Sequence, residues 1–236
     1  MQGQNYRLGI GLWLGPIPWI CTDQSIQKCL IFEVDLSGGV IREALDPLVS
    51  GQFNPFEMKN EELEALRYPI GRFQPLSEYP TGLLEDWFEA LYRYPDKLST
   101  LVSPLTEGQL DTPYRPNGWT VRQVVHHISD SHHNSYMRFK WALTESSPLI
   151  KVYDEKAWAG LFDARTGPIE LSLAHLTAIH QKLVFLLRGL DHTELKKKFI
   201  HPVGGPTTLE ENVGRYVWHG NHHYAHIANL LRSRGW

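Results

Sequence analysis

His219-Gly220-Asn221-His222-His223-Tyr224-Ala225-His226 is the most informative segment of this sequence. Just upstream, Thr208-Leu209-Glu210-Glu211 has the pattern of a capping box, in which two side chains satisfy free amides at a helix N-terminus. No proline follows, so the sequence predicts a helix from near residue 209 to about residue 233. Residues four apart on an α-helix differ by about 40° around its axis, which places His219 and His223 on one face, one turn apart.

The helix face that carries this pair is otherwise apolar. Tyr216, Gly220, Ile227 and Leu230 lie on it at steps of three and four residues, as on a helix that packs against a core. The two imidazoles should therefore point into a helical bundle, at a spacing that lets both reach one metal ion. Two histidines at this spacing also occur by chance in a histidine-rich stretch, so a metal site needs support from elsewhere in the chain.

Length, composition and charge are those of an ordinary soluble globular protein. The chain has 236 residues, of which 42% are hydrophobic and 21% charged, and its net charge is −3. Nothing suggests the basic patch that nucleic-acid binding requires. No apolar run approaches the roughly 18 residues of a membrane span, and a convincing signal peptide is absent. We expect a cytoplasmic protein with neither a nucleic-acid nor a membrane partner.

Cysteine and histidine are distributed unevenly. Cys21 and Cys29 lie near the N-terminus, so the body of the chain has neither a disulfide framework nor a thiol that could act as nucleophile or metal ligand. All twelve histidines lie between His126 and His226. Thiol chemistry in the body of the chain would therefore need a thiol brought in as substrate.

The first 57 residues differ in character from the rest. Glycine and proline interrupt the apolar segment at residues 9–20, and residues 28–34 resemble a single strand that would lack a partner. One hypothesis is that translation starts at Met58, with residues 1–57 an upstream extension of doubtful structure. The alternative is a genuine arm that packs on the body, residues 58–236. Intact mass of the native protein distinguishes the two, because a mass that corresponds to a Met1 start contradicts the first.

Helical periodicity marks the first two long segments of the body. Large apolar residues recur at helical spacing over residues 83–102, where Pro95 should kink or divide the helix. Thr120-Val121-Arg122-Gln123 is a second capping box and predicts a helix that runs to about residue 144. Between them, residues 106–118 are expected to form turns and a loop.

A third long helix should open at Pro168 and Glu170 and end at Gly189, with leucines around much of its circumference. The helix that carries His219 is the fourth. Little strand pattern accompanies these helices, and residues 199–207 are interpreted as a turn. The connections are unequal, and residues 145–163 form a long one. The sequence therefore predicts an all-α four-helix bundle with a long crossover connection, not a simple up-down-up-down arrangement.

The second predicted helix supplies a third core-side histidine. His127 lies beside Ile128 on the apolar stripe of that helix, so it should face the core or its edge. His126 is rotated by about 100° and is expected to be a surface or partly buried polar residue, paired with Asp130 one turn on. His132 and His133 are ambiguous. Histidines other than 127, 219 and 223 are expected not to bind metal.

His127, His219 and His223 together form a candidate three-nitrogen site. Burying three imidazoles without partners is costly, and a metal ion removes that cost by using their lone pairs. Three histidine ligands with a fourth position open are typical of catalytic zinc or a similar divalent ion. That position can bind water and lower its pKa towards about 7, or bind and deprotonate a thiol.

Other metal and nucleotide motifs are absent. Gly220 follows His219 where the metalloprotease His-Glu-x-x-His signature needs glutamate. Arg215 and Tyr216 occupy the positions before His219 where a di-iron bundle needs glutamate. The sequence also contains no dinucleotide-binding glycine fingerprint, no phosphate-binding loop and no Gly-x-Ser-x-Gly elbow.

Five longer motifs carry a family resemblance. They are Tyr68-Pro69-Ile70-Gly71-Arg72-Phe73, Gln109-Leu110-Asp111-Thr112-Pro113-Tyr114-Arg115, Gly118-Trp119-Thr120-Val121-Arg122-Gln123-Val124-Val125-His126-His127, Tyr153-Asp154-Glu155-Lys156-Ala157-Trp158 and Tyr216-Val217-Trp218-His219 with His222-His223. Together they resemble the YfiT group of the DinB superfamily over residues 68–236. The resemblance implies a four-helix bundle, usually a homodimer, that holds a divalent metal by three histidines at the positions of His127, His219 and His223.

The resemblance also implies an enzyme that binds one divalent metal ion per chain, zinc or nickel. Members are labelled metal-dependent hydrolases, and a related group transfers a low-molecular-weight thiol, bacillithiol, onto electrophiles. The leading hypothesis is such an S-transferase, acting on a small-molecule thiol and an electrophile. The alternative is a hydrolase that uses metal-bound hydroxide, for which Asp130 and Asn134 lie one and two turns from His127, although asparagine is not a base. A third is a non-catalytic bundle that binds metal or a small molecule. No catalytic acid or base is identified from the sequence.

Overall fold

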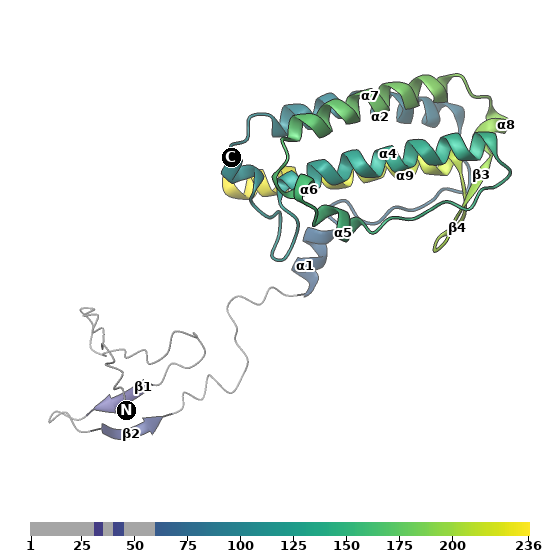
Figure 1. Cartoon of the computed structure of the whole chain (residues 1–236). Coiled ribbons are helices and arrows are strands. Elements are labelled where there is room, and N and C mark those ends of the chain that lie inside the picture. Colours follow the sequence, from purple (N-terminus) through teal and green to yellow (C-terminus); the bar gives the residue numbers. More distant parts are fainter. Residues whose placement is uncertain (1–30, 35–39, 45–59) are drawn as a thin grey trace, which may run out of the picture. The chain divides into compact units, whose positions relative to one another are not determined.

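The computed structural model describes residues 31–34, 40–44 and 60–236, and the chain divides into two units, Met1–Met58 and Lys59–Trp236 (Figure 1). In the first unit, β1 (Ile31–Val34) pairs antiparallel with β2 (Val40–Ala44). The strand expected to lack a partner therefore has one, and that expectation was wrong. The hypothesis of a start at Met58 stays a prediction, and most of residues 1–57 lie outside those described.

Four long helices form the second unit, as the sequence predicted. They are α2 (Thr81–Val102), α4 (Val121–Thr144), α7 (Ile169–Arg188) and α9 (Leu209–Arg234). The shorter elements are α1 (Asn60–Arg67), α3 (Glu107–Leu110), α5 (Glu155–Ala159), α6 (Phe162–Thr166), α8 (His192–Leu195), β3 (Lys198–His201) and β4 (Gly205–Thr208). None of the described helices combines the length and apolar composition that crossing a membrane requires.

Several segments have more regular structure than predicted. Pro95 lies inside α2 and does not divide it. The connection at residues 145–163 contains α5 and the start of α6, and the turn expected before the last helix is the antiparallel hairpin of β3 and β4. Gly205 in this hairpin has a φ of +75°, a conformation that glycine adopts at little cost.

Side-chain caps fix where α4 and α9 begin. Thr120 and Gln123 form the complete predicted capping box, each side chain accepting a hydrogen bond from the other residue's backbone N–H. At α9 only half of the predicted box forms: Thr208 Oγ1 accepts from the Glu211 N–H at 3.2 Å, whereas the Glu211 carboxylate pairs with Arg215. The prediction that Thr208 caps the N-terminus of α9 is therefore confirmed. The prediction that the Glu211 side chain accepts a hydrogen bond from the Thr208 N–H was wrong.

Polar contacts between helices give their directions. His126 Nδ1 lies 2.7 Å from Ser172 Oγ, and farther along both helices His132 Nδ1 lies 2.8 Å from His180 Nε2, so α4 and α7 run in parallel. Parallel neighbours need a return segment, and the chain between α4 and α7 runs back along the bundle to supply it (Figure 1). This segment is the predicted long crossover.

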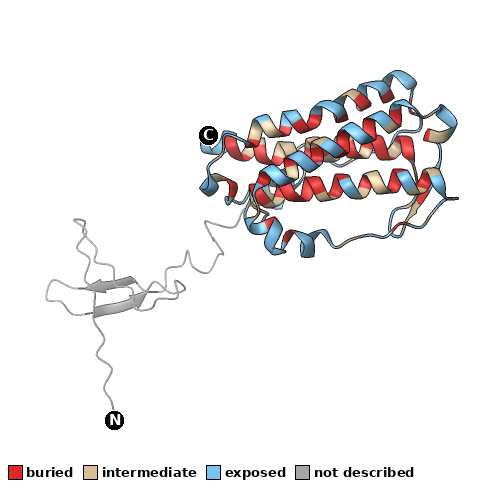
Figure 2. Cartoon of the chain, turned by 45° about the horizontal axis from the view of Figure 1, so that its top comes forward, coloured by how far each residue is buried: buried red, intermediate tan, exposed pale blue. Residues whose placement is uncertain are grey.

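The order of the helices in the bundle also departs from their order in sequence. Both α2 and α4 pack on α7 and on α9, which places α2 and α4 at opposite corners. Buried residues lie along the inward faces of all four helices (Figure 2). The third long helix is less buried than its leucines suggested, because Leu171 and Phe185 of α7 are 68% and 85% exposed.

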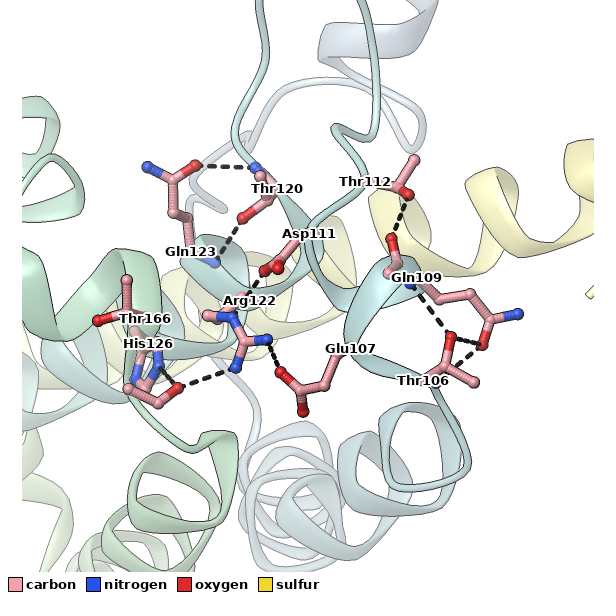
Figure 3. Close-up of polar contacts among 12 residues, drawn as sticks. Thr106, Glu107, Gln109, Asp111, Thr112, Thr120, Arg122, Gln123, His126 and Thr166 are labelled. Atoms are coloured by element: carbon pink, nitrogen blue, oxygen red, sulfur yellow. Dashed lines mark hydrogen bonds and ion pairs between the residues drawn. The ribbon is translucent and has the colours of Figure 1, made fainter.

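Arg122 fixes the N-terminal end of α4 (Figure 3). Its guanidinium is almost fully buried and donates to the Asp111 and Glu107 carboxylates and to the Gly167 carbonyl. These contacts join α4 to α3 and to Gly167, the residue that follows α6. They hold the first turns of α4, and with them His127, against the rest of the bundle.

We expect Gly220→Val to destabilise the protein by about 1–3 kcal/mol, because α9 passes close to α2 at this point. A Cβ atom at Gly220 would lie 2.9 Å from the ring of Tyr94, which is buried and held by a 2.8 Å hydrogen bond to the Gly220 carbonyl. Urea unfolding measures the change. Gly82→Ala is the control, since a Cβ at Gly82 meets no heavy atom within 4 Å, and an equal loss in both variants would contradict this account.

Candidate metal centre

The structure brings together the three histidines selected from the sequence. His127 comes from α4, and His219 and His223 lie one turn apart on α9. One ring nitrogen of each lies within 4.8 Å of one ring nitrogen of the others. The ring centroids are 4.6 to 5.3 Å apart, with rings at 51° to 70° to one another, so the imidazoles converge rather than stack.

Burial keeps these imidazoles neutral. It lowers the pKa of His127 to about 4, with the nearby His222 adding to the effect. Burial also lowers the pKa of His219 and of His223 well below its usual range, and neighbouring imidazoles add to it. Because a metal binds the neutral ring through its lone pair, the three side chains are in the right protonation state near pH 7.

The donor set fits a divalent transition metal. His223 Nδ1 is a buried nitrogen with no hydrogen-bond partner among the described residues. Three neutral imidazoles suit zinc or nickel better than magnesium or calcium, which prefer oxygen. That His127, His219 and His223 bind such an ion stays a prediction, and the arrangement meets its geometric and chemical requirements.

A second histidine group lies next to the first on α9. His222, His223 and His226 also have nitrogens within 4.8 Å of one another. His222 and His226 were expected not to be ligands, although their spacing repeats that of His219 and His223. His223 belongs to both groups, so the second group competes with the first and is not an independent site.

His222 and His226 pack in an aromatic surround. The His222 ring stacks on Trp218 at 4.6 Å, and the His226 ring stacks on Tyr114 at 4.1 Å. His226 Nε2 lies 3.0 Å from the carbonyl oxygen of Arg67, to which it donates. Burial lowers the pKa of each imidazole to about 4, so both are neutral beside the candidate ligands.

Two buried histidines extend the site into the bundle. His132, which the sequence left ambiguous, lies with Nε2 3.2 Å from His219 Nδ1. Its other ring nitrogen contacts His180 of α7, whose Nδ1 contacts the Leu91 carbonyl of α2. No pattern in the sequence singles out His180, because the contacts that bury it come from other helices.

The structure corrects the expectation for His126. It is buried and bonds Ser172 Oγ and the Gly167 carbonyl, and not Asp130 as predicted. Asp130 has a pKa raised to about 6 by burial, with the negative charge of Asp163 adding to it. Its backbone carbonyl accepts a hydrogen bond from the side-chain amide of Asn134.

His133 bonds His175 on the outer side of α4 and α7. Among the described hydrogen bonds, none joins Asp130 or Asn134 to His127, His219 or His223. The structure therefore does not assign either one as a catalytic base.

Comparison with known proteins identifies relatives of this chain. A family model described as "DinB superfamily" matches residues 90–227. "Putative metal-dependent hydrolase YfiT" of Bacillus subtilis (strain 168) is 48% identical over 172 residues, which are 72% of this chain and 97% of the relative. "Putative metal-dependent hydrolase OB0782" of Oceanobacillus iheyensis is 45% identical over 170 residues, 72% of this chain and 98% of that one.

A solved structure agrees with these matches. It is described as "YfiT from Bacillus subtilis is a probable metal-dependent hydrolase with an unusual four-helix bundle topology". It superimposes with a TM-score of 0.72 at 48% identity and covers 73% of this chain and 99% of that one. The sequence identity, the family match over most of the bundle and the shared topology agree, and the chain belongs to the DinB superfamily, within its YfiT-like members.

Proposed function

We propose that the protein is an enzyme that depends on one divalent metal ion per chain, zinc or nickel, held by His127, His219 and His223. The observation that carries this proposal is the convergence of three buried, neutral imidazoles from two helices. The relatives from Bacillus subtilis and Oceanobacillus iheyensis are both named "putative metal-dependent hydrolase", which supports metal dependence.

The reaction we favour is transfer of a small-molecule thiol onto an electrophile. When bound, a divalent ion lowers the pKa of a thiol or water at its open position. The chain's own residues orient the ligand nitrogens and hold them neutral, and the described body has no cysteine, so the thiol comes from the substrate. Hydrolysis is the second candidate, because the names of both relatives state a hydrolase.

The experiment has two stages. Elemental mass spectrometry of the full chain should find about one divalent ion per chain after zinc or nickel is offered. The loaded protein is then assayed for conjugation of a thiol to an electrophile, with ester and amide hydrolysis run beside it. If the chain binds no ion, both proposed reactions are contradicted. If the loaded protein hydrolyses esters or amides but does not conjugate the thiol, hydrolysis is the reaction supported.

We also propose that the chain forms a homodimer. Phe185 is 85% exposed on α7 and borders a hollow of about 580 Å³ that Tyr136 and Lys182 also line. Large exposed aromatic residues beside a hollow are typical of surfaces that another chain covers. Light scattering coupled to size exclusion gives the mass, and a monomer at micromolar concentration would contradict this proposal.

A further inference from the structure

Arg138 of α4 is a buried cation that no carboxylate neutralises within the described part of the chain. Arg138 is only 9% exposed, and no described Asp or Glu oxygen lies within 4 Å of its side-chain nitrogens. The guanidinium has five N–H donors. One of them, on Nη1, donates to Tyr216 Oη at 3.3 Å, and this is the one hydrogen bond found for this side chain among the described residues.

Arg122 on the same helix shows how this protein treats a buried arginine that serves structure. Its guanidinium pairs with two carboxylates and one carbonyl. A buried charge without such partners is costly, and a purely structural role does not explain why Arg138 is buried without them. The Phe199 ring, 6.0 Å from the Arg138 guanidinium carbon, is at the limit of a cation–π contact.

One side chain, Tyr216, connects Arg138 to the candidate metal ligands. Tyr216, which accepts its hydrogen bond, has its ring 5.4 Å from the His219 ring. The pKa of His219 is lowered by burial first, then by neighbouring imidazoles, and also by the positive charge of Arg138. An anionic group paired with Arg138 would therefore be held beside the candidate metal centre.

We propose that Arg138 binds a carboxylate of the substrate, so that the thiol taken by the proposed metal enzyme is an anionic one. This inference rests on the proposed function and names the substrate class of the same site. Charge-assisted hydrogen bonds from arginine to a carboxylate are among the strongest in proteins, with bidentate geometry where two donors are free.

Matched thiols test this proposal on the full chain loaded with cobalt(II), where a bound thiolate gives a charge-transfer absorption band. The pairs are 3-mercaptopropionate with 3-mercaptopropanol and 6-mercaptohexanoate with 6-mercaptohexanol. In the wild type, the carboxylate member of at least one pair should bind about 10- to 100-fold more tightly. In Arg138→Gln this preference should disappear, whereas Arg215→Gln, which removes an arginine already paired with Glu211, should keep it.

The outcomes separate the two proposals. Equal binding within both pairs, or a preference that survives in Arg138→Gln, overturns the role of Arg138. If no thiol gives a band, the thiol-transfer function fails instead. Succinate titrated calorimetrically into the metal-free chain then tests Arg138 by itself: binding that Arg138→Gln loses supports the role, and absence of binding to the wild type overturns it.

A second, independent observation concerns the orientation of His219. One chain of hydrogen bonds runs through all four long helices, from the Leu91 carbonyl to His180, His132 and His219. A carbonyl oxygen only accepts, so His180 Nδ1 carries a proton. His180 is fully buried, and its described hydrogen-bond partners include no acid, which favours the neutral ring with a lone pair on Nε2.

The proton on His180 Nδ1 determines which ring nitrogen carries the proton in His132 and in His219. His132 Nδ1 must donate to His180 Nε2, which leaves a lone pair on His132 Nε2. His219 Nδ1 must then donate to His132 Nε2, and the lone pair of His219 lies on its Nε2. We infer that His132 and His180 are positioning residues that fix His219 in the tautomer that presents Nε2 to the metal, as hydrogen-bonded neighbours of ligand histidines do. Burial lowers the pKa of His180 to about 4, in agreement with a neutral ring.

Long-range ¹H–¹⁵N correlation of histidine rings in the metal-free full chain tests this inference without any metal. His180, His132 and His219 should each carry the ring proton on Nδ1, with assignment by single variants. A proton on Nε2 of any of the three overturns the relay, and it does so whether or not the proposed metal site exists.

Metal affinity gives a second readout of the relay. Zinc competition with a chromophoric chelator should show binding weakened about 10- to 100-fold in His132→Phe, the range known for outer-shell partners. His175→Phe is the matched control, because among the described hydrogen bonds His175 bonds His133 and Ser129 and not His180, His132 or His219. Unchanged affinity in a folded His132→Phe protein overturns the positioning role.

Discussion

Replacing His223 by alanine should weaken divalent metal binding by more than about 100-fold. Loss of an outer-shell partner of a ligand costs about 10- to 100-fold, and loss of one of three ligands should exceed that. His223 is also the residue that the two histidine groups of α9 share, so its removal affects whichever group binds the ion. Zinc or nickel affinity by chelator competition, with elemental mass spectrometry of the purified chain, gives the measurement.

Two further variants assign the ion to one group. His219→Ala removes a member of the group that includes His127, and His226→Ala removes a member of the other. We expect His219→Ala to reduce affinity as strongly as His223→Ala, and His226→Ala to retain most of it. Strong loss in His226→Ala with little loss in His219→Ala would move the site to His222, His223 and His226. Circular dichroism confirms that each variant is folded.

The sequence predicted those features of the site that depend on one helix at a time. His219 and His223 lie one turn apart on an apolar face because helix geometry is local, and Ile128 placed His127 on the core side of α4 for the same reason. The helix ends were predicted to within about two residues, since threonine caps and glycine ends act over a few residues.

Features that depend on contacts between helices were missed. His126 bonds Ser172, 46 residues away, and not Asp130 one turn on. His180 is buried by contacts with His132 and Leu91 on two other helices. No local pattern identifies such partners, because the return segment that makes α4 and α7 parallel determines which side chains meet. The same holds for Arg138 and Tyr216, which are 78 residues apart.

Acidification from pH 7 to pH 5.5 should strongly destabilise the metal-free protein. Burial lowers the pKa of His127, His180 and His226 to about 4, against about 6.5 in the unfolded chain. Between these values the unfolded state binds more protons, so the stability that these residues contribute is complete above pH 6.5 and is lost as pH falls. His219 and the other buried imidazoles of lowered pKa act in the same direction.

The expected loss is large compared with the stability of a typical domain. One pH unit below 6.5, each of the three residues costs about 1.4 kcal/mol, or about 4 kcal/mol together, against a total of about 5–15 kcal/mol. Urea unfolding with a chelator present, at pH 7.0 and pH 5.5, measures the difference. His180→Phe removes one titrating ring, so its free energy of unfolding should fall by about 1.4 kcal/mol less than that of the wild type between the two pH values. His192→Gln changes an exposed position of α8, and its free energy of unfolding should fall as much as that of the wild type. Equal urea midpoints at the two pH values would mean that these imidazoles are not buried neutral in the folded chain, and the case for lone pairs that converge on a metal would lose its electrostatic basis.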